Sequence, residues 1–211
     1  MTPKKQYYEN VANTIIANLE KRQMKGYYCE DSKAAVQKVL DLVPAGASVS
    51  WGGTMTLTES GVMDALRAGD FSLIDRDLAK TPQEKKEVFA KAVCADYFFM
   101  STNAITMNGE LVNVDGNGNR VACLCCGPEN IIILAGMNKV VTSVEEGHNR
   151  ARNTAAPMNT LRLHKNTPCS TKGKCFDCQS PDCICSQIVV TRRSHIPGRI
   201  KVILIGEELG Y

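Results

Sequence analysis

Apolar residues at the start of the chain recur at the spacing of amphipathic helices. One such pattern predicts a helix over about residues 3–25, and a second predicts a helix over about residues 31–43 with Asp31 or Ser32 as its N-cap. The apolar positions of the first helix are Tyr7, Val11, Ile15, Ile16 and Leu19. We therefore expect residues 1–45 to be made of helices.

The next part of the chain alternates between short apolar strands and helices. We expect strands at residues 48–51, 71–76 and 96–106, and helices at residues 56–69 and 81–95. Pro82 stands at the first position of the last helix, directly after its predicted N-cap Thr81. Strands that alternate with helices are typical of a parallel sheet covered by helices, so the predicted fold class is α/β with a mostly parallel sheet.

The second half of the chain changes pattern. Residues 109–128 contain two apolar runs around "DGNGN", which predicts a β-hairpin. The wholly apolar residues 130–136 predict a strand that is covered on both faces. Two helices are expected next, at residues 143–156 and 157–164, and then a cysteine-rich loop near the C-terminus at residues 169–186. Two final strands are expected at residues 187–193 and 199–209. No repeat or low-complexity segment divides the chain, so we expect a single domain over residues 1–211.

Composition and charge narrow the classes of partner. The chain has 211 residues, 44% of them hydrophobic, which is enough to bury a core without disulfides. Its formal charge of +3 is small and its bases are interspersed with acids, so no nucleic-acid partner is expected. The first 23 residues lack the apolar stretch of a signal peptide, and no window has the length of a membrane span. We expect a cytoplasmic protein without a membrane partner, and association between copies of the chain stays open.

Half of the ten cysteines lie in the segment "CSTKGKCFDCQSPDCICS", with the spacing C-x5-C-x2-C-x4-C-x-C. The pair Cys175 and Cys178 has the spacing that lets two thiolates bind one metal ion, and the flanking cysteines can complete a set of four. The alternatives are disulfides, unliganded thiols and thioredoxin-like redox chemistry. A reducing cytoplasm disfavours disulfides, and the position of the cysteines in a loop disfavours thioredoxin-like chemistry. We expect a metal site, and the choice between zinc and a [4Fe-4S] cluster stays open.

Candidate ligand-binding residues stand where predicted strands end. Paired glycines follow residues 48–51 and allow close approach of a ligand to the backbone, and the helix that follows presents free N–H groups. In an open α/β sheet, ligands bind outside the carboxyl ends of strands. Arg120 could bind a carboxylate or phosphate bidentately, and Glu110 and Asp115 are the candidate carboxylates for a base or nucleophile. The predicted ligand-binding residues are Gly52, Gly53, Thr54, Asn103, Thr106, Asp115 and Asn119, and the predicted catalytic residues are Glu110 and Arg120.

Four stretches of the chain resemble the LUD-domain family, the lactate-utilisation proteins, and in particular its short, stand-alone members. They are "SWGGTMTLTESGVMDAL", "ADYFFMSTNAITMNGELVNVDGNGNRVACLCCGPENIIILAGMNKVV", "RARNTAAPMNTLRL" and the cysteine-rich segment with the final "VILIGEELGY". The resemblance implies a fold shared with ribose-5-phosphate isomerase, glucosamine-6-phosphate deaminase and CoA transferases. It also implies a site at the strand ends that takes a small carboxylate or phosphate.

The resemblance further implies a set of metal ligands and a role. In the family the residue before "IC" is often arginine, whereas this chain has Cys183 there, so the implied ligands are Cys169, Cys175, Cys178 and Cys185. The family name comes from the conversion of lactate to pyruvate by a multi-protein, iron–sulfur-containing system. We expect a component of a system that oxidises lactate or a related small carboxylate, acting with partner lactate-utilisation or iron–sulfur proteins. The alternatives are an enzyme like the CoA transferases or sugar-phosphate isomerases, or a non-catalytic ligand-sensing module.

Overall fold

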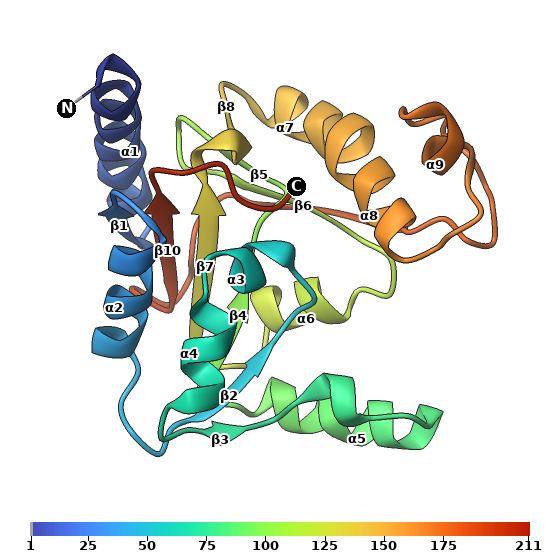
Figure 1. The fold of residues 1–211 in the computed structure, drawn as a ribbon, viewed down its shortest axis with the longest axis horizontal. Helices are drawn as coiled ribbons and strands as arrows, with labels where there is room; N and C mark the ends of the chain where they lie inside the picture. Colours follow the sequence, from blue (N-terminus) through green and yellow to red (C-terminus); the bar gives the residue numbers. More distant parts are fainter. Residues whose placement is uncertain (1) are drawn as a thin grey trace.

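A six-stranded parallel sheet forms the centre of the computed structural model, which describes residues 2–211 (Figure 1). The strands lie in the order β1-β10-β7-β4-β2-β3, and all neighbours are parallel. In chain order they are β1 (Lys25–Cys29), β2 (Ser48–Trp51), β3 (Ser72–Leu73), β4 (Tyr97–Met100), β7 (Asn130–Gly136) and β10 (Ile200–Ile205). The predicted α/β fold with a mostly parallel sheet and flanking helices is confirmed.

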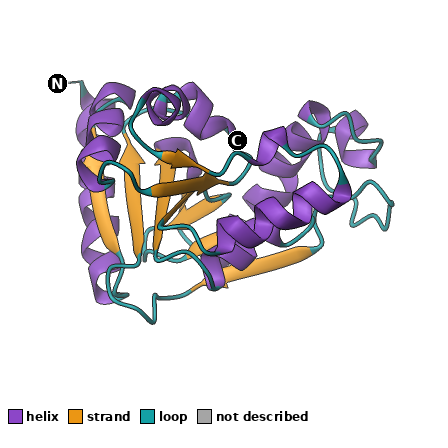
Figure 2. Cartoon of the chain, turned by 90° about the horizontal axis from the view of Figure 1, so that it is seen from below, coloured by secondary structure: helices purple, strands orange, loops and turns teal. Residues whose placement is uncertain are grey.

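Helices cover both faces of this sheet, which explains the wholly apolar sequence of its central strand β7. Successive residues of β7 point to opposite faces, and Ile131 packs in one core cluster while Ile132 packs in the other. The first cluster includes residues of α1 (Pro3–Lys21) and α6 (Asn119–Cys125). The second includes residues of α2 (Ser32–Leu42), α3 (Met55–Glu59) and α4 (Val62–Ala68). Figure 2 shows the strands between helices when the molecule is seen from below.

A second, four-stranded sheet lies beside the first, with the strand order β8-β5-β6-β9. Its strands are β5 (Ala104–Thr106), β6 (Leu111–Asp115), β8 (Val140–Val141) and β9 (Gln187–Thr191). β6 is antiparallel to both of its neighbours, and β5 is parallel to β8. The remaining helices are α5 (Pro82–Val93), α7 (Val144–Arg150), α8 (Ala156–Arg162) and α9 (Pro168–Lys172). A π-helical turn, Ala151–Ala155, joins α7 and α8 into one rod.

The two predicted N-terminal helices are present as α1 and α2, and the prediction missed the strand β1 between them. The first helix ends at Lys21, and the chain then forms the edge strand β1, which pairs with β10. Gln23 takes a left-handed backbone conformation, with a φ angle of 61°, and this ends the helical path. A Cβ atom at Gly26 would come within 2.8 Å of Ile16, so glycine allows α1 to pack closely on β1.

The predicted hairpin at residues 109–128 was also wrong. β6 is followed by a loop and by helix α6, not by a second strand. β6 instead pairs with β5 on one side and with the distant β9 on the other, so both of its edges are already occupied. Cys123 is buried in α6, whereas Cys125 and Cys126 are exposed.

Other predicted elements are shorter or divided. The predicted helix at residues 56–69 is broken into α3 and α4 at Gly61, whose φ angle is 74°. The predicted strand at residues 71–76 is reduced to the two residues of β3. The two last strands of the chain, β9 and β10, belong to different sheets. The predicted strand at residues 96–106 is divided into β4 and β5, because the chain leaves the main sheet after Met100 and enters the second sheet at Ala104. This crossing, residues 101–103, forms part of the candidate site.

Within residues 2–211, no helix combines the length and the apolar content that crossing a membrane requires.

Candidate functional site

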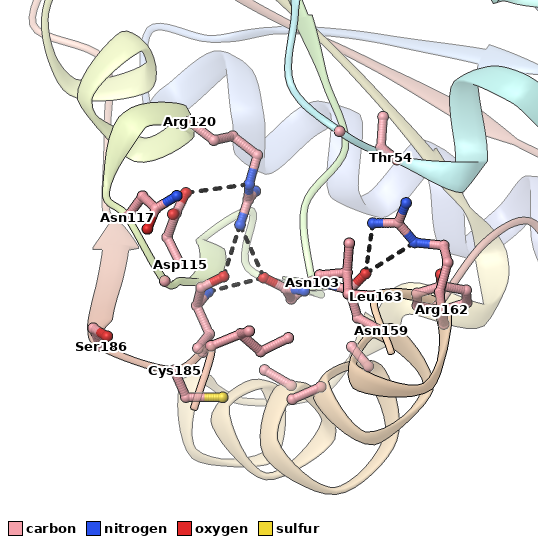
Figure 3. A pocket seen from close by; sticks show the side chains of 18 of the residues that line it. Thr54, Asn103, Asp115, Asn117, Arg120, Asn159, Arg162, Leu163, Cys185 and Ser186 are labelled. Atoms are coloured by element: carbon pink, nitrogen blue, oxygen red, sulfur yellow. Dashed lines mark hydrogen bonds and ion pairs between the residues drawn. The ribbon is translucent and has the colours of Figure 1, made fainter. Parts of the chain in front are cut away.

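A cavity of about 590 Å³ lies at the carboxyl edge of the parallel sheet (Figure 3). Four parallel strands deliver their following residues to it. These are Gly53 and Thr54 after β2, Ser101 to Asn103 after β4, Lys139 after β7 and Tyr211 after β10. The rod of α7 and α8 and residues 181–186 of the cysteine-rich segment line it as well. The predicted position of the site, at the carboxyl ends of strands, therefore coincides with this cavity.

Basic side chains outnumber acidic ones in the lining of the cavity. The bases are Arg76, Arg120, Lys139, Arg162 and Lys165, and the acids are Asp115 and Asp182. Both acids are already paired with a base of the lining: Asp115 lies 3.5 Å from Arg120, and Asp182 lies 3.3 Å from Lys165. A cleft lined by one sign of charge concentrates ligands of the other sign. The cavity is therefore suited to an anion.

Arg120, on α6, joins the two sheets at the wall of the cavity. Its Nη1 donates to the carbonyl of Ser101 at 3.0 Å and to the side-chain oxygen of Asn113. Its Nη2 donates to the carbonyl of Val114 at 2.9 Å and to Asn103 Oδ1 at 3.2 Å. Burial lowers the pKa of Arg120, and the Asp115 carboxylate opposes this effect. Because these donors are occupied by protein acceptors, Arg120 is a positioned positive charge and not the free two-pronged ligand clamp that the sequence suggested.

Gly52 lies behind Arg120. A Cβ atom at this position would stand 3.0 Å from both Cγ and Cδ of Arg120, closer than ordinary van der Waals contact. The glycine therefore makes room for the arginine side chain, whereas its neighbour Gly53 lines the cavity. The next residue, Thr54, caps α3 by accepting from the backbone N–H of Thr56 at 3.2 Å. Since α3 has only five residues, its dipole adds little to anion binding.

Asn103, Asp115 and Asn119 also line the cavity. Asn103 Oδ1 accepts from Arg120 and from the backbone N–H of Val114 at 2.8 Å, so the side-chain NH₂ of Asn103 remains as the group that can donate to a ligand. Asp115 accepts from the backbone N–H of Gly118 at 2.8 Å and thereby fixes the turn into α6. Figure 3 shows Asn103 between Arg120 and the rod that carries Arg162.

Lys139 is the functional candidate that sequence reasoning missed. Only 1% of its surface is exposed, and its Nζ donates to Thr56 Oγ1 and to Ser101 Oγ, both at 2.9 Å. Burial, and after it the positive charges of Arg150 and Arg120, lower the pKa of Lys139 to about 7, while Glu59 acts in the opposite direction. A lysine three residues after the end of the buried strand β7 was the available signal, because the carboxyl end of a central parallel strand is a binding position.

Two of the predicted site residues lie elsewhere. Glu110 does not line the cavity: it stands on the connection between β5 and β6, where it forms an ion pair with Arg22 at the end of α1 and accepts from the Thr106 hydroxyl. Thr106 is fully buried there. The structure thus brings together Gly53, Thr54, Asn103, Asp115, Asn119 and Arg120, places Gly52 behind them, and separates Thr106 and Glu110 from them.

The cysteine-rich segment reaches the cavity through Cys183 and Cys185. Burial, and after it the neighbouring thiols of Cys183, Cys175 and Cys169, raise the pKa of Cys185 to about 12. Cys175 Sγ accepts hydrogen bonds from Arg152 Nε at 3.3 Å and from the backbone N–H of Asp177 at 3.4 Å. All ten thiols are free of disulfides. Across residues 2–211, no three His, Cys, Asp or Glu side chains are arranged closely enough to hold a metal ion.

The fold and the site define an α/β protein with a cationic cavity at the carboxyl edge of a parallel sheet. The model of the LUD-domain family matches residues 12–205, and the chain belongs to this family. A crystal structure of a DUF162 family protein from Deinococcus radiodurans shares its fold, with a TM-score of 0.55 and 10% identity over 94% of this chain and 98% of that chain.

Two further structures are only partly similar. eIF2B delta from Chaetomium thermophilum is 18% identical over 52% of this chain and 48% of that chain, with a TM-score of 0.34. Ribose 5-phosphate isomerase from Plasmodium falciparum is 14% identical over 53% of this chain and 52% of that chain, with a TM-score of 0.33. Likenesses as weak as these two support no argument about function. Among curated proteins, none matches the chain.

The hydrogen bonds of Arg120 predict a large effect of a conservative substitution. In the Arg120→Lys variant an ammonium with three N–H donors replaces the planar fork, so at least one of the acceptors Ser101, Asn113, Val114 and Asn103 loses its bond to this side chain. A buried acceptor without a donor costs about 1–3 kcal/mol, so we expect the free energy of unfolding in urea to fall by at least about 1 kcal/mol.

The matched control for this prediction is Arg162→Lys. Arg162 is exposed and donates only to Asn159 on its own helix, so its replacement should change the free energy of unfolding by less than about 0.5 kcal/mol. Equal effects of the two substitutions would mean that Arg120 does not join the sheets as described.

Proposed function

We propose that this LUD-domain protein binds a small carboxylate in the cationic cavity, as a component of a system that oxidises lactate or a related acid. The observation that carries the proposal is the charge of the lining: its two acids pair with Arg120 and Lys165, and this leaves three of its five bases, Arg76, Lys139 and Arg162, without an acid of the lining. The family to which the chain belongs supports the lactate-related role. Arg162 and the NH₂ group of Asn103 are the proposed ligands for the carboxylate, and a phosphate group would suit the same donors.

The volume of the cavity supports a second occupant. Ligand pockets of proteins range from about 300 to about 1,000 Å³, and a three-carbon acid would fill only part of the 590 Å³ present here. The unfilled part reaches Cys183 and Cys185 on the cysteine-rich side. A partner protein, or a larger organic anion, could enter this part while the acid is held near Asn103.

The alternative of an enzyme like the CoA transferases needs a carboxylate that acts as a nucleophile or base. Glu110 is held outside the cavity by Arg22, and Asp115 is engaged by Arg120 and by the backbone of the turn into α6. The geometry therefore favours this alternative less. A non-catalytic ligand-sensing module would use the same cavity, and the binding experiment below applies to it equally.

We further propose that the cysteine-rich segment holds a metal centre, either zinc or a [4Fe-4S] cluster. Four thiolates are the donors that both groups prefer, and N–H groups such as those of Arg152 and Asp177, which donate to Cys175, stabilise a thiolate. The proposed ligands are Cys169, Cys175, Cys178 and Cys185. Cys183 is the competitor of Cys178, because the thiols that act on the pKa of Cys185 are those of Cys183, Cys175 and Cys169. A cluster would supply electron transfer to iron–sulfur partners, whereas zinc would supply only a structural cross-link.

Small acids should stabilise the protein against heat. L-lactate, pyruvate and phosphate are added separately, and a ligand present at about 100 times its Kd should raise the free energy of unfolding by about 2.7 kcal/mol. Arg162→Gln should weaken binding by about tenfold or more because a charge-assisted hydrogen bond is worth about 1.5–3 kcal/mol.

The control variant for this binding is Arg193→Gln, since Arg193 is exposed and does not line the cavity. It should bind as the wild type does. If none of the three anions shifts the melting temperature beyond sodium chloride at equal ionic strength, the proposed binding is wrong.

The metal content of protein purified without oxygen tests the cysteine centre. We expect about one zinc ion, or about four irons with a brown colour, per chain. Cys185→Ser and Cys178→Ser should both lose the metal, and Cys183→Ser should keep it. If Cys178→Ser keeps the metal and Cys183→Ser loses it, Cys183 is the fourth ligand. Colourless zinc protein would contradict electron transfer through this chain, and metal-free protein would contradict the centre itself.

A further inference from the structure

Lys139 is a buried lysine without an ion-pair partner among residues 2–211. The charged groups nearest to it are the guanidiniums of Arg120 on α6 and Arg150 on α7, and the carboxylate of Glu59 on α3. Glu59 is itself engaged, because its Oε2 accepts from the backbone N–H of Gly210 at 2.6 Å. A further positive charge beside these two guanidiniums is therefore unfavourable, and Glu59 offsets this effect only in part.

Lys139 Nζ has four tetrahedral positions, and its bond to Cε and its two hydrogen bonds leave one of them free. Both hydroxyls that contact it have carbonyl acceptors of their own, since Thr56 donates toward Leu209 O at 3.4 Å and Ser101 toward Thr102 O at 3.4 Å. Both hydroxyls can therefore accept from Nζ, at 2.9 Å each. A neutral amine has two N–H groups, which these contacts satisfy, and its lone pair then occupies the fourth corner. The ammonium form would have a third N–H without a partner in a buried, cationic place.

We propose that Lys139 is an amine nucleophile that takes a 2-oxo acid in this cavity as an imine. The proposal rests on the proposed function, because it uses the same cavity and the same carboxylate-binding groups. A 2-oxo acid has two groups that suit the residues lining this cavity. Its carboxylate suits Arg162 and the Asn103 amide, and its adjacent carbonyl carbon suits the amine of Lys139. Lysines that are desolvated or stand beside other cations are activated in this way for reaction with carbonyl substrates.

The step is balanced without an oxidant. The lone pair of Nζ forms a bond to the carbonyl carbon, the carbonyl oxygen takes up a proton, and the nitrogen releases one, which gives a carbinolamine. Loss of water then breaks the carbon–oxygen bond and leaves the imine. The net change is amine plus 2-oxo acid to imine plus water, so no redox partner is needed. Lactate, which has a hydroxyl in place of the carbonyl, can bind in the same place and cannot form the imine.

The pH dependence of the reaction follows from the same surroundings. Burial, Arg150 and Arg120 lower the pKa of Lys139 to about 7, so the neutral amine increases as the pH rises through 7 and is the main form above it. Solvent-exposed lysines keep the ordinary pKa of about 10.4 and remain protonated in this range. Imine formation at Lys139 should therefore rise from pH 6 to about pH 8 and then level off.

Trapping with sodium cyanoborohydride tests the proposal. The purified full chain is incubated with pyruvate and the reductant, which delivers hydride to the imine carbon and leaves a stable secondary amine, and peptide mass spectrometry locates the adduct. We expect the adduct on Lys139, its loss in Lys139→Met, and its retention in Lys201→Met, a half-buried lysine of β10 that lies outside the cavity and donates to Asn130 and to the carbonyl of Gly198. Lactate with the same reductant should give no adduct.

Mapping in the wild type decides the question even if Lys139→Met does not fold. An adduct that is absent, or spread over exposed lysines without preference for Lys139, overturns the proposal. If pyruvate and lactate both raise the melting temperature and no adduct forms on Lys139, the imine is wrong and carboxylate binding stands. If Lys139 is labelled by pyruvate and lactate gives no stabilisation, the imine stands and the proposed binding of lactate is wrong.

Discussion

The guanidinium of Arg120 is the contact on which the candidate site depends. Its hydrogen bonds join the segment that leaves β4 to the neighbouring strand β6, and so connect the parallel sheet to the second sheet. Gly52 gives the arginine the space that it occupies at the end of β2. A planar group with five N–H donors can satisfy acceptors from several segments at once, which a lysine cannot do. The wall of the cavity is therefore set by one buried side chain.

The same arrangement determines the chemistry of the cavity. Burial of Lys139, together with the guanidiniums of Arg150 and Arg120 near it, makes a positive charge on its side chain costly. The result is a cavity that favours negative charge in a ligand and a neutral amine in one of its own side chains. The excess of bases in the lining thus favours anion binding, and the lowered pKa of Lys139 results first from burial and then from Arg150 and Arg120. The cysteine-rich segment adds thiols at the opposite side, where residues 181–186 close the cavity.

Much of the fold was predictable because strand and helix patterns are local, and the site followed from the rule that ligands bind at the carboxyl ends of parallel strands. Asn103, Thr54 and Gly53 were found in this way. The hairpin error arose because the glycines of "DGNGN" suit a turn before either a strand or a helix, and the partner of β6 lies far along the chain in β9. Glu110 was misplaced for the same reason, since its partner Arg22 is 88 residues away in sequence. The burial of Lys139 is a tertiary property that no local pattern shows.

The pKa of Lys139 tests most directly the claim that this cavity favours negative charge and an uncharged amine. NMR titration of lysine-labelled protein can measure it, with Lys139→Met to assign the signal. We expect a midpoint at a pH of about 7 in the free protein, and a higher midpoint when phosphate or lactate is bound, because a bound anion favours the ammonium form. A midpoint at the ordinary 10.5, unchanged by either anion, would contradict the charge distribution described for the cavity.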